Sequence, residues 1–331
     1  MDLLHAREAA KESLRAAGDA PKKLAAIHIG AVSLLSLVLA VVGYFLSEGV
    51  SSTGGLSGIG TRTVLTTVQF LLSTASSIAL PFWETGFLFA ALSFARKEEA
   101  TPDSLLEGFR RFAPLLRMFF LQFLIFLGLA VASVQISSIL FTLTPLSAGA
   151  QELLMGLNTT DPTVLEQTLL SDEALLQQLL PHMIPFYIIF ALLYAVVSIP
   201  MFYRFRMASF AMMDGCTRAR AALRASTRLM RGNRWSLFLV DLRFWWFYAG
   251  QLLIALIAYV PDLLNLLGVS LPINPDITVL LFYFVYLVLQ FFFFLLFGSY
   301  AHTTYAHCYE MLFSATPQVQ TASAAPVPRD P

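Results

Sequence analysis

The chain has 331 residues, of which 57% are hydrophobic and only 13% are charged, and its mean hydropathy is +0.70. A water-soluble fold of this length cannot bury so much apolar surface, so the composition excludes a soluble globular protein and indicates a membrane protein. The 21 basic and 21 acidic residues cancel to a net charge of zero, but they are distributed unevenly along the chain.

Six stretches are long and apolar enough to cross a bilayer, which takes about 20 predominantly apolar residues. They predict an all-α fold, a bundle of six transmembrane helices in an integral membrane domain over residues 1–314. The tail over residues 315–331, rich in Ala, Pro, Thr and Gln, is predicted to be disordered and cytoplasmic. The predicted spans are residues 24–46, 64–95, 114–143, 183–203, 235–260 and 277–300.

The basic residues mark alternate gaps between these spans. Lys and Arg are frequent before the first span and in the gaps 96–113 and 204–234, whereas the gaps 144–182 and 261–276 contain none. Because Lys and Arg are retained on the cytoplasmic side of a membrane, this pattern predicts a multi-pass protein of the cell membrane with both termini cytoplasmic. Arg62 is the one basic residue on the opposite side and does not change the predicted orientation.

An amphipathic helix is predicted on the cytoplasmic surface before the first, third and fifth spans, so the chain divides into three similar units of surface helix and two spans. The first carries basic residues at every fourth position, and Thr101 followed by Pro102 can start the second. The third carries a row of arginines opposite small apolar residues and ends near Gly232. We predict that this row contacts anionic lipid headgroups; it consists of Arg220, Arg224, Arg228 and Arg231.

Nucleic-acid binding by these arginines is a poor alternative, because the helix lies next to the membrane and accompanies no nucleic-acid-binding fold. The outer gap 144–182 is acidic and contains two helix-start signals, Asp161 with Pro162 and Ser171. We expect two short helices on the outer leaflet there. Their lack of basic charge is compatible with a lipid surface or with a protein partner.

Glu84 is the most specific candidate for a functional group. It lies 11 residues before the end of the second span, or about 16 Å along a helix, which predicts a position near the bilayer middle. A carboxylate there costs several kcal/mol unless it is protonated, paired or hydrated. It could be a proton or cation site in a cavity beside Pro81, or a partner in an interhelical ion pair with an arginine of the fourth or fifth span, which we favour.

The pairing hypothesis joins the charged residues of three spans into one buried network, with Arg206 reaching out to lipid phosphates. His28, in the first span, is interpreted as an interior histidine with satisfied hydrogen bonds or as a hydrogen-bonding contact between helices. The predicted members of the network, which could alternatively line a transport path, are Glu84, Asp241, Arg204 and Arg243.

Nothing in the sequence predicts a cofactor or a metal. His302, His307, Cys308 and Glu310 are close in sequence, but two histidines five residues apart point in different directions on a helix, unlike the i, i+4 pair of helical zinc sites. Cys216 and Cys308 are predicted to be free thiols. No phosphate-binding glycine loop, nucleophile elbow or nucleotide fingerprint occurs, so we expect a protein that is not an enzyme.

Three groups of residues resemble the domain of unknown function 975 family. They are the run from Ser226 through Arg231-Gly232-Asn233-Arg234-Trp235 to Asp241-Leu242, the element Gly108-Phe109-Arg110-Arg111-Phe112, and the ending Thr303-Thr304-Tyr305-Ala306 with Tyr309-Glu310. The resemblance implies a predicted multi-pass membrane protein, chiefly of Gram-positive bacteria, in a family without an assigned reaction. Met201 follows Pro200 where the family often has Gly, and the outer insertion 144–182 is longer than expected, which points to outer-face partners particular to this protein.

The leading expectation is a non-enzymatic scaffold or envelope-homeostasis factor that contacts membrane lipids through its basic inner-face helices. The first alternative is a transporter or channel for a small molecule or ion, with a polar path lined by Glu84 and Asp241 beside the kinks at Pro81 and Pro200. The second is an intramembrane enzyme, which would need several catalytic side chains at one depth.

Overall fold

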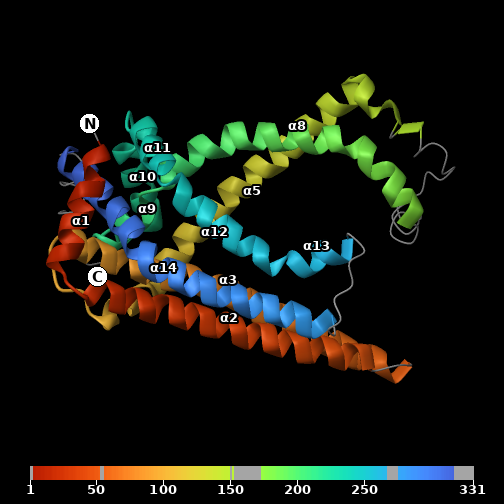
Figure 1. Cartoon of the computed structure of the whole chain (residues 1–331). Coiled ribbons are helices and arrows are strands. Elements are labelled where there is room, and N and C mark those ends of the chain that lie inside the picture. Colours follow the sequence, from red (N-terminus) through yellow and green to blue (C-terminus); the bar gives the residue numbers. More distant parts are fainter. Residues whose placement is uncertain (1–2, 53–55, 150, 153–172, 267–274, 317–331) are drawn as a thin grey trace, which may run out of the picture. The chain divides into compact units, whose positions relative to one another are not determined.

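The computed structural model describes residues 3–52, 56–149, 151–152, 173–266 and 275–316, and within these residues every regular element is a helix (Figure 1). The predicted all-α fold is therefore confirmed. Most of the outer insertion, residues 153–172, and the tail from residue 317 onward lie outside the described residues. The predictions of two outer helices and of a disordered tail fall largely on those segments.

The chain divides into two compact units, Met1–Arg117 with Arg206–Pro331, which we call unit 1, and Met118–Phe205, which we call unit 2. Unit 1 carries both chain ends and all of the elements that position the candidate site. Its elements are the 3₁₀ helices η1 (Leu3–His5) and η2 (Pro102–Leu106), the start of α5 (Phe112–Leu143), and the α-helices α1 (Ala6–Ala16), α2 (Ala20–Ser52), α3 (Leu56–Ala95), α4 (Glu107–Arg110), α9 (Ala208–Met213), α10 (Ala219–Leu229), α11 (Arg234–Arg243), α12 (Trp245–Ala258), α13 (Val260–Leu266) and α14 (Pro275–Ser314).

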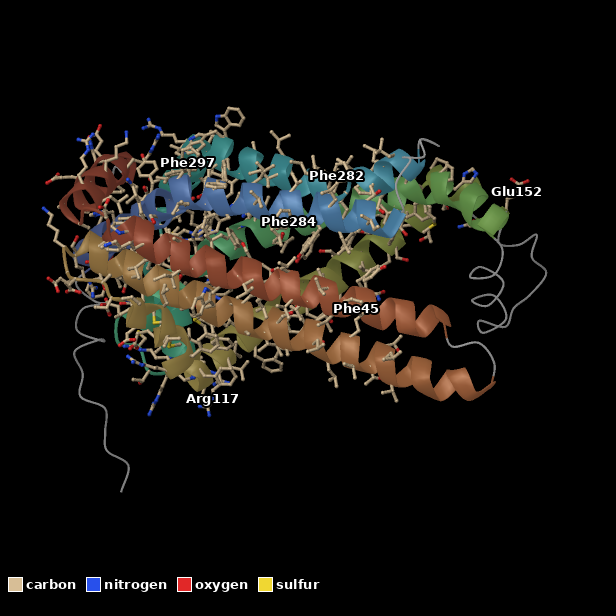
Figure 2. The ribbon with its side chains drawn as sticks, turned by 60° about the horizontal axis from the view of Figure 1, so that its bottom comes forward. Phe45, Arg117, Glu152, Phe282, Phe284 and Phe297 are labelled. Atoms are coloured by element: carbon tan, nitrogen blue, oxygen red, sulfur yellow. The ribbon has the colours of Figure 1, made fainter. Side chains whose placement is uncertain are left out.

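Three long helices, α2, α3 and α14, run side by side in unit 1 and contact one another (Figure 1). Away from the two chain ends these helices expose large apolar side chains, such as Phe45 on α2, Phe70 on α3 and Phe284 on α14 (Figure 2 labels the first and the last). Exposure of so large an apolar surface to water is unfavourable, whereas its contact with lipid hydrocarbon is favourable.

At their other ends, which are the start of α2 and the ends of α3 and α14, these helices pack with shorter helices around a buried core. We call this region the helical head. It consists of α1, η2, α4, α9 and α10 together with the last turns of α3 and α14 and the first turns of α2. One cluster of buried apolar side chains in this region combines residues from four elements: Leu24, Ala25, Ile29, Phe87, Ala90, Phe94, Leu105 and Phe294. Burial of these side chains stabilises the head in the way that it stabilises a soluble domain.

Five helices of the described chain are long and apolar enough to cross a membrane, or six if one bent pair counts as a span. They cover Ala20–Phe45, Val64–Ala95, Phe112–Leu143, Pro181–Met213 and Ile277–Ser314. The predicted span 235–260 is the bent pair, since α11 and α12 meet at 57°. The helix breaks at Phe244, whose buried ring packs beside Tyr300 and Tyr305 of α14.

Unit 2 contains the rest of α5, the 3₁₀ helix η3 (Pro145–Ser147) and α8 (Glu173–Phe205). Helix α8 includes Pro181, Pro185 and Pro200 and covers the predicted span 183–203. Phe141 of α5 and Phe186 of α8 make an edge-to-face contact with their ring centroids 5.9 Å apart, a favoured geometry for two aromatic rings.

Helices form at all three places where amphipathic segments were predicted. Helix α1 precedes α2, η2 and α4 precede α5, and α10 precedes α11. Thr101 starts η2 as predicted, with its backbone N–H donating to Ser104 Oγ. Gly232, with φ of +85°, follows the end of α10 in a conformation that a residue with a side chain rarely adopts.

Two glycines let α3 approach the η2–α4 segment closely. A Cβ atom at Gly86 would overlap the backbone carbonyl of Leu105, and a Cβ atom at Gly108 would overlap the backbone carbonyl of Phe82. Gly108 is also the first residue of the Gly108–Phe112 element of the family resemblance. Because it has no side chain, the two backbones can come together at this position. By contrast, a Cβ atom at Gly128 of α5 would meet no atom within 4 Å.

We therefore expect Gly108→Ala to lower the free energy of unfolding by about 1–3 kcal/mol, because backbone atoms must move to admit the methyl group. Thermal unfolding of the detergent-solubilised protein measures this. Gly128→Ala is the matched control and should be neutral or slightly stabilising, since alanine favours a helix. Equal stability of the two variants would contradict the close contact.

Candidate functional site

One side of α14 carries a row of polar side chains that contact charged residues from other helices. His302, Tyr305 and Tyr309 are spaced by three and four residues, so they lie on the same side of the helix, and Glu310 follows. We call these four residues the α14 polar row. Each of them contacts a charged residue from another part of unit 1.

His302 takes part in a cluster of a carboxylate and two histidines. One oxygen of Glu84 lies 3.6 Å from His28 Nε2, and the other lies 3.6 Å from His302 Nε2. The His28 ring stacks on Phe87 and Phe294 with centroid distances of 4.6 and 5.3 Å. We call Glu84, His28 and His302 the Glu84 cluster.

Tyr305 lies in the second cluster, which surrounds Asp241 of α11. Its hydroxyl donates to Asp241 Oδ1 and lies 2.6 Å from the hydroxyl of Tyr248. The guanidinium of Arg206 is 3.8 Å from the same carboxylate and 4.8 Å from the centre of the Tyr305 ring. Asp241 is thus held by a cation and a phenol, as a largely buried carboxylate must be.

Tyr309 and Glu310 complete the row at the end of α14. Tyr309 donates to Asp214 at 2.9 Å, and Arg96 lies 2.6 Å from Asp214 and 2.7 Å from Glu310. Burial lowers the pKa of the Arg96 guanidinium, but its hydrogen bonds and charge interactions with these carboxylates outweigh burial and raise the pKa overall. Burial, and then the charge of Asp214, raise the pKa of the Cys216 thiol, so this free cysteine is a poor nucleophile.

The structure places the predicted network residues in separate surroundings. Glu84 contacts two histidines, Asp241 contacts Arg206, and Arg243 is exposed without an ion pair in the described part of the chain. Arg204 belongs to unit 2, where it lies over the ring of Phe205. Arg206, which was expected to reach lipid phosphates, instead pairs with Asp241.

The structure places Glu84 beside residues of two other long helices. Glu84 is level with His28 and His302, which lie within a few residues of the predicted inner ends of the first and sixth spans. Helix α3 continues for 11 residues beyond Glu84, and α14 continues for 12 beyond His302, into the helical head. The position of Glu84 near the bilayer middle stays a prediction, since Glu84 lies within the candidate span Val64–Ala95.

Sequence reasoning missed the two histidines as partners of Glu84 and the tyrosines as partners of the aspartates. The spacing of His302, Tyr305 and Tyr309 was a signal that could have shown these residues on one side of a helix. The four residues once weighed as a metal site point to different partners, since His307 contacts Ser13 and Glu310 contacts Arg96. Within the described residues no group of three or more metal-ligating side chains is suitably placed.

The arginines of α10 form a different surface. One side of α10 is buried, with Ala222, Ser226 and Leu229 fully covered. The other side exposes the predicted basic row, and in the described structure no acidic side chain forms an ion pair with it: Arg220, Arg224, Arg228 and Arg231. Trp235, just beyond this row, is 68% exposed.

Together these features define the class of this molecule, an all-helical protein whose long apolar helices fit a membrane protein and whose polar contacts gather in a helical head. The sequence profile of the family described as "Protein of unknown function (DUF975)" matches residues 13–316. The chain belongs to this family. No curated protein and no solved structure is significantly similar to it.

The Asp241 cluster predicts a strong effect of a small substitution. We expect Asp241→Asn to lower the free energy of unfolding by about 2–4 kcal/mol, because it removes the negative charge that faces the partly buried Arg206. Chemical unfolding in detergent micelles measures the change. Asp262→Asn on α13, where the side chain is exposed, is the matched control, and equal losses in both variants would show that Asp241 has no special structural role.

Proposed function

We propose that this protein is a multi-pass protein of the bacterial cytoplasmic membrane, with both termini in the cytoplasm, that acts as a non-enzymatic scaffold contacting anionic lipids. In this proposal it supports the organisation or homeostasis of the cell envelope. The observation that carries it is the exposed arginine row of α10. Three cations on one side of α10, followed by Arg231 just beyond its end, with apolar residues buried on the other side, are suited to a surface of negative charge.

The positive-inside distribution of Lys and Arg supports the proposed orientation, because it puts the arginine row on the side where anionic lipids are enriched. The exposed Trp235 supports the same location, since tryptophan favours the boundary between headgroups and hydrocarbon. For the outer insertion 144–182, which is acidic and contains no Lys or Arg, we propose a protein partner.

The lipid contact can be tested by removing the positive charges of the arginine row. Each arginine near an anionic membrane surface contributes about 1 kcal/mol, so each Arg→Gln change should weaken phosphatidylglycerol binding about fivefold. The variant to test replaces Arg220, Arg224, Arg228 and Arg231 together. Native mass spectrometry of protein released from mixed phosphatidylglycerol and phosphatidylcholine nanodiscs measures the anionic lipid that stays bound.

The matched control replaces the same four arginines by lysine, which keeps the charge and should keep most of the preference for phosphatidylglycerol. Added salt should weaken the preference of the wild type and of the lysine variant, because salt screens exposed charges. If the glutamine variant retained as much phosphatidylglycerol as the wild type, the lipid contact would not depend on this row.

Transport of protons or of a proton-coupled solute is a second candidate function, favoured by the Glu84 cluster. A half-exposed carboxylate beside two histidines contains the groups that proton pathways use. Protein reconstituted in liposomes should then conduct protons under an imposed membrane potential, and Glu84→Gln should reduce the flux to that of protein-free vesicles. A pH-sensitive dye inside the vesicles reports the flux, Glu99→Gln is the control, and unchanged flux in Glu84→Gln would exclude this path.

A further inference from the structure

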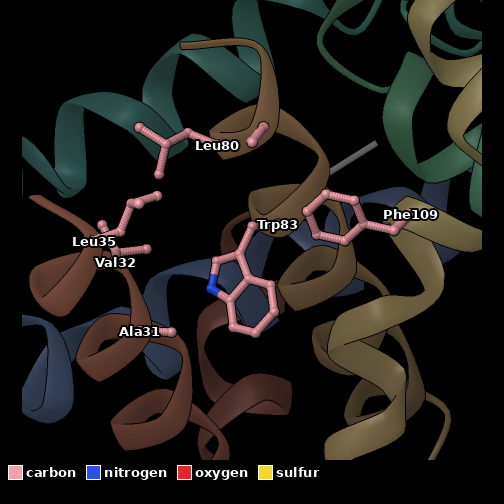
Figure 3. Close-up of a pocket in the computed structure, with 7 residues that line it drawn as sticks. Ala31, Val32, Leu35, Leu80, Trp83 and Phe109 are labelled. Carbon is pink, nitrogen blue, oxygen red and sulfur yellow. The ribbon is translucent and has the colours of Figure 1, made fainter. Parts of the chain in front are cut away.

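The Glu84 cluster lies at the boundary between the buried head and the apolar part of unit 1. Towards the head, Phe87 and Phe294 cover its rings. Away from the head, Trp83 stacks near His28 and lines an apolar pocket of about 130 Å³ (Figure 3). Figure 3 shows the Trp83 ring between Ala31 and Val32 of α2 on one side and Phe109 of α4 on the other. The surroundings of the cluster are therefore apolar on both sides.

The charge of the cluster is not balanced by its neighbours. If both imidazoles are neutral, Glu84 leaves a net charge of −1, and the cation Arg206, whose charge acts on His302, pairs with Asp241. Several other charged groups beside α3 pair with one another; these are Glu107 with Arg110 and Arg111, Glu12 with Lys97, and Arg96 with Asp214 and Glu310. In the described structure the remaining charged residues of α1, α2 and η2 form no ion pair with the cluster; they are Arg7, Glu8, Lys11, Arg15, Lys22, Lys23 and Asp103. An uncompensated charge in apolar surroundings favours the uptake of a counter-ion.

The cluster offers positions for a proton and surroundings that stabilise it. The Nδ1 atoms of His28 and His302 are buried and have no hydrogen-bond partner among the described residues, and His28 is only 2% exposed. An imidazolium at His28 would face the carboxylate at 3.6 Å and three stacked aromatic rings within about 6 Å, the range in which an aromatic face attracts a cation.

From this geometry we infer that Glu84, His28 and His302 form a proton-binding site that holds one proton at neutral pH. The proton belongs to the three groups together, because closely coupled groups titrate as a unit. Glu84, with 48% of its side chain exposed, is the route by which the proton exchanges, while the histidines are its buried partners. The inference deepens the second candidate function by naming the ligand, but the site binds a proton whether or not the protein transports it.

The chain contains an internal reference for this site. His5 lies 3.7 Å from Glu8, and both side chains are largely exposed, so this pair has the same chemical groups in water. The chain has five histidines in all, few enough to assign by nuclear magnetic resonance.

The test is a titration of the ¹⁵N-histidine-labelled protein in nanodiscs between about pH 5 and pH 9, with infrared spectroscopy of the Glu84 carboxyl group. We expect the cluster to hold one proton, as an imidazolium or as a carboxylic acid, with an affinity at least about tenfold above that of His5. Glu84→Gln should abolish this excess affinity, because the cluster is then neutral without the proton, whereas Glu8→Gln should leave the cluster unchanged.

If the Glu84→Gln variant does not fold, the titration of the wild-type protein alone still tests the inference. Two neutral imidazoles and an ionised Glu84 carboxylate at neutral pH would overturn the inference. So would a histidine titration that is the same in Glu84→Gln as in the wild type. A bound proton without proton flux in liposomes would instead refute transport and leave the binding site intact.

Discussion

Hydrocarbon does not solvate charge, and the distribution of polar contacts in unit 1 follows from this constraint. The ion pairs that join different helices of unit 1 lie in the helical head or at its edge, where Arg96, Arg206 and Glu84 find their partners. Beyond them α2, α3 and α14 expose apolar side chains for many turns. The same three helices are therefore stabilised by burial at one end and suited to lipid at the other.

Helix α14 runs through both parts of unit 1, the apolar part and the helical head. Its first turns carry exposed apolar residues such as Phe284, and its last turns carry the α14 polar row, which binds carboxylates of α3, of α11 and of the segment after α9. The family resemblance rested on segments far apart in the sequence, and the structure brings two of them together when Tyr305 donates to Asp241. A third segment reaches the head through Arg111, which donates to the carbonyls of Met212 and Met213.

Two surfaces with opposite electrostatics result from this arrangement. On α10 the arginines remain exposed because no acidic side chain of the described chain faces them, which leaves their charge available for an external anion. In the Glu84 cluster the excess charge is negative and lies on a half-exposed carboxylate beside a histidine that aromatic rings cover, which leaves it available for a small cation. The lipid and the proton that we propose as ligands thus act at independent sites, one on α10 and one at the Glu84 cluster.

Local periodicity determined the helices, their apolar lengths, the cap at Thr101 and the two sides of α10, because these features depend on residues within a few turns of one another. The partners of Glu84 and Asp241 were decided only by the tertiary structure. His28 and His302 are separated by more than 270 residues, and no spacing rule connects them. The sequence also could not show that α3 and α14 continue past the apolar boundary, since a helix in lipid and a helix in a buried head satisfy their backbone hydrogen bonds in the same way.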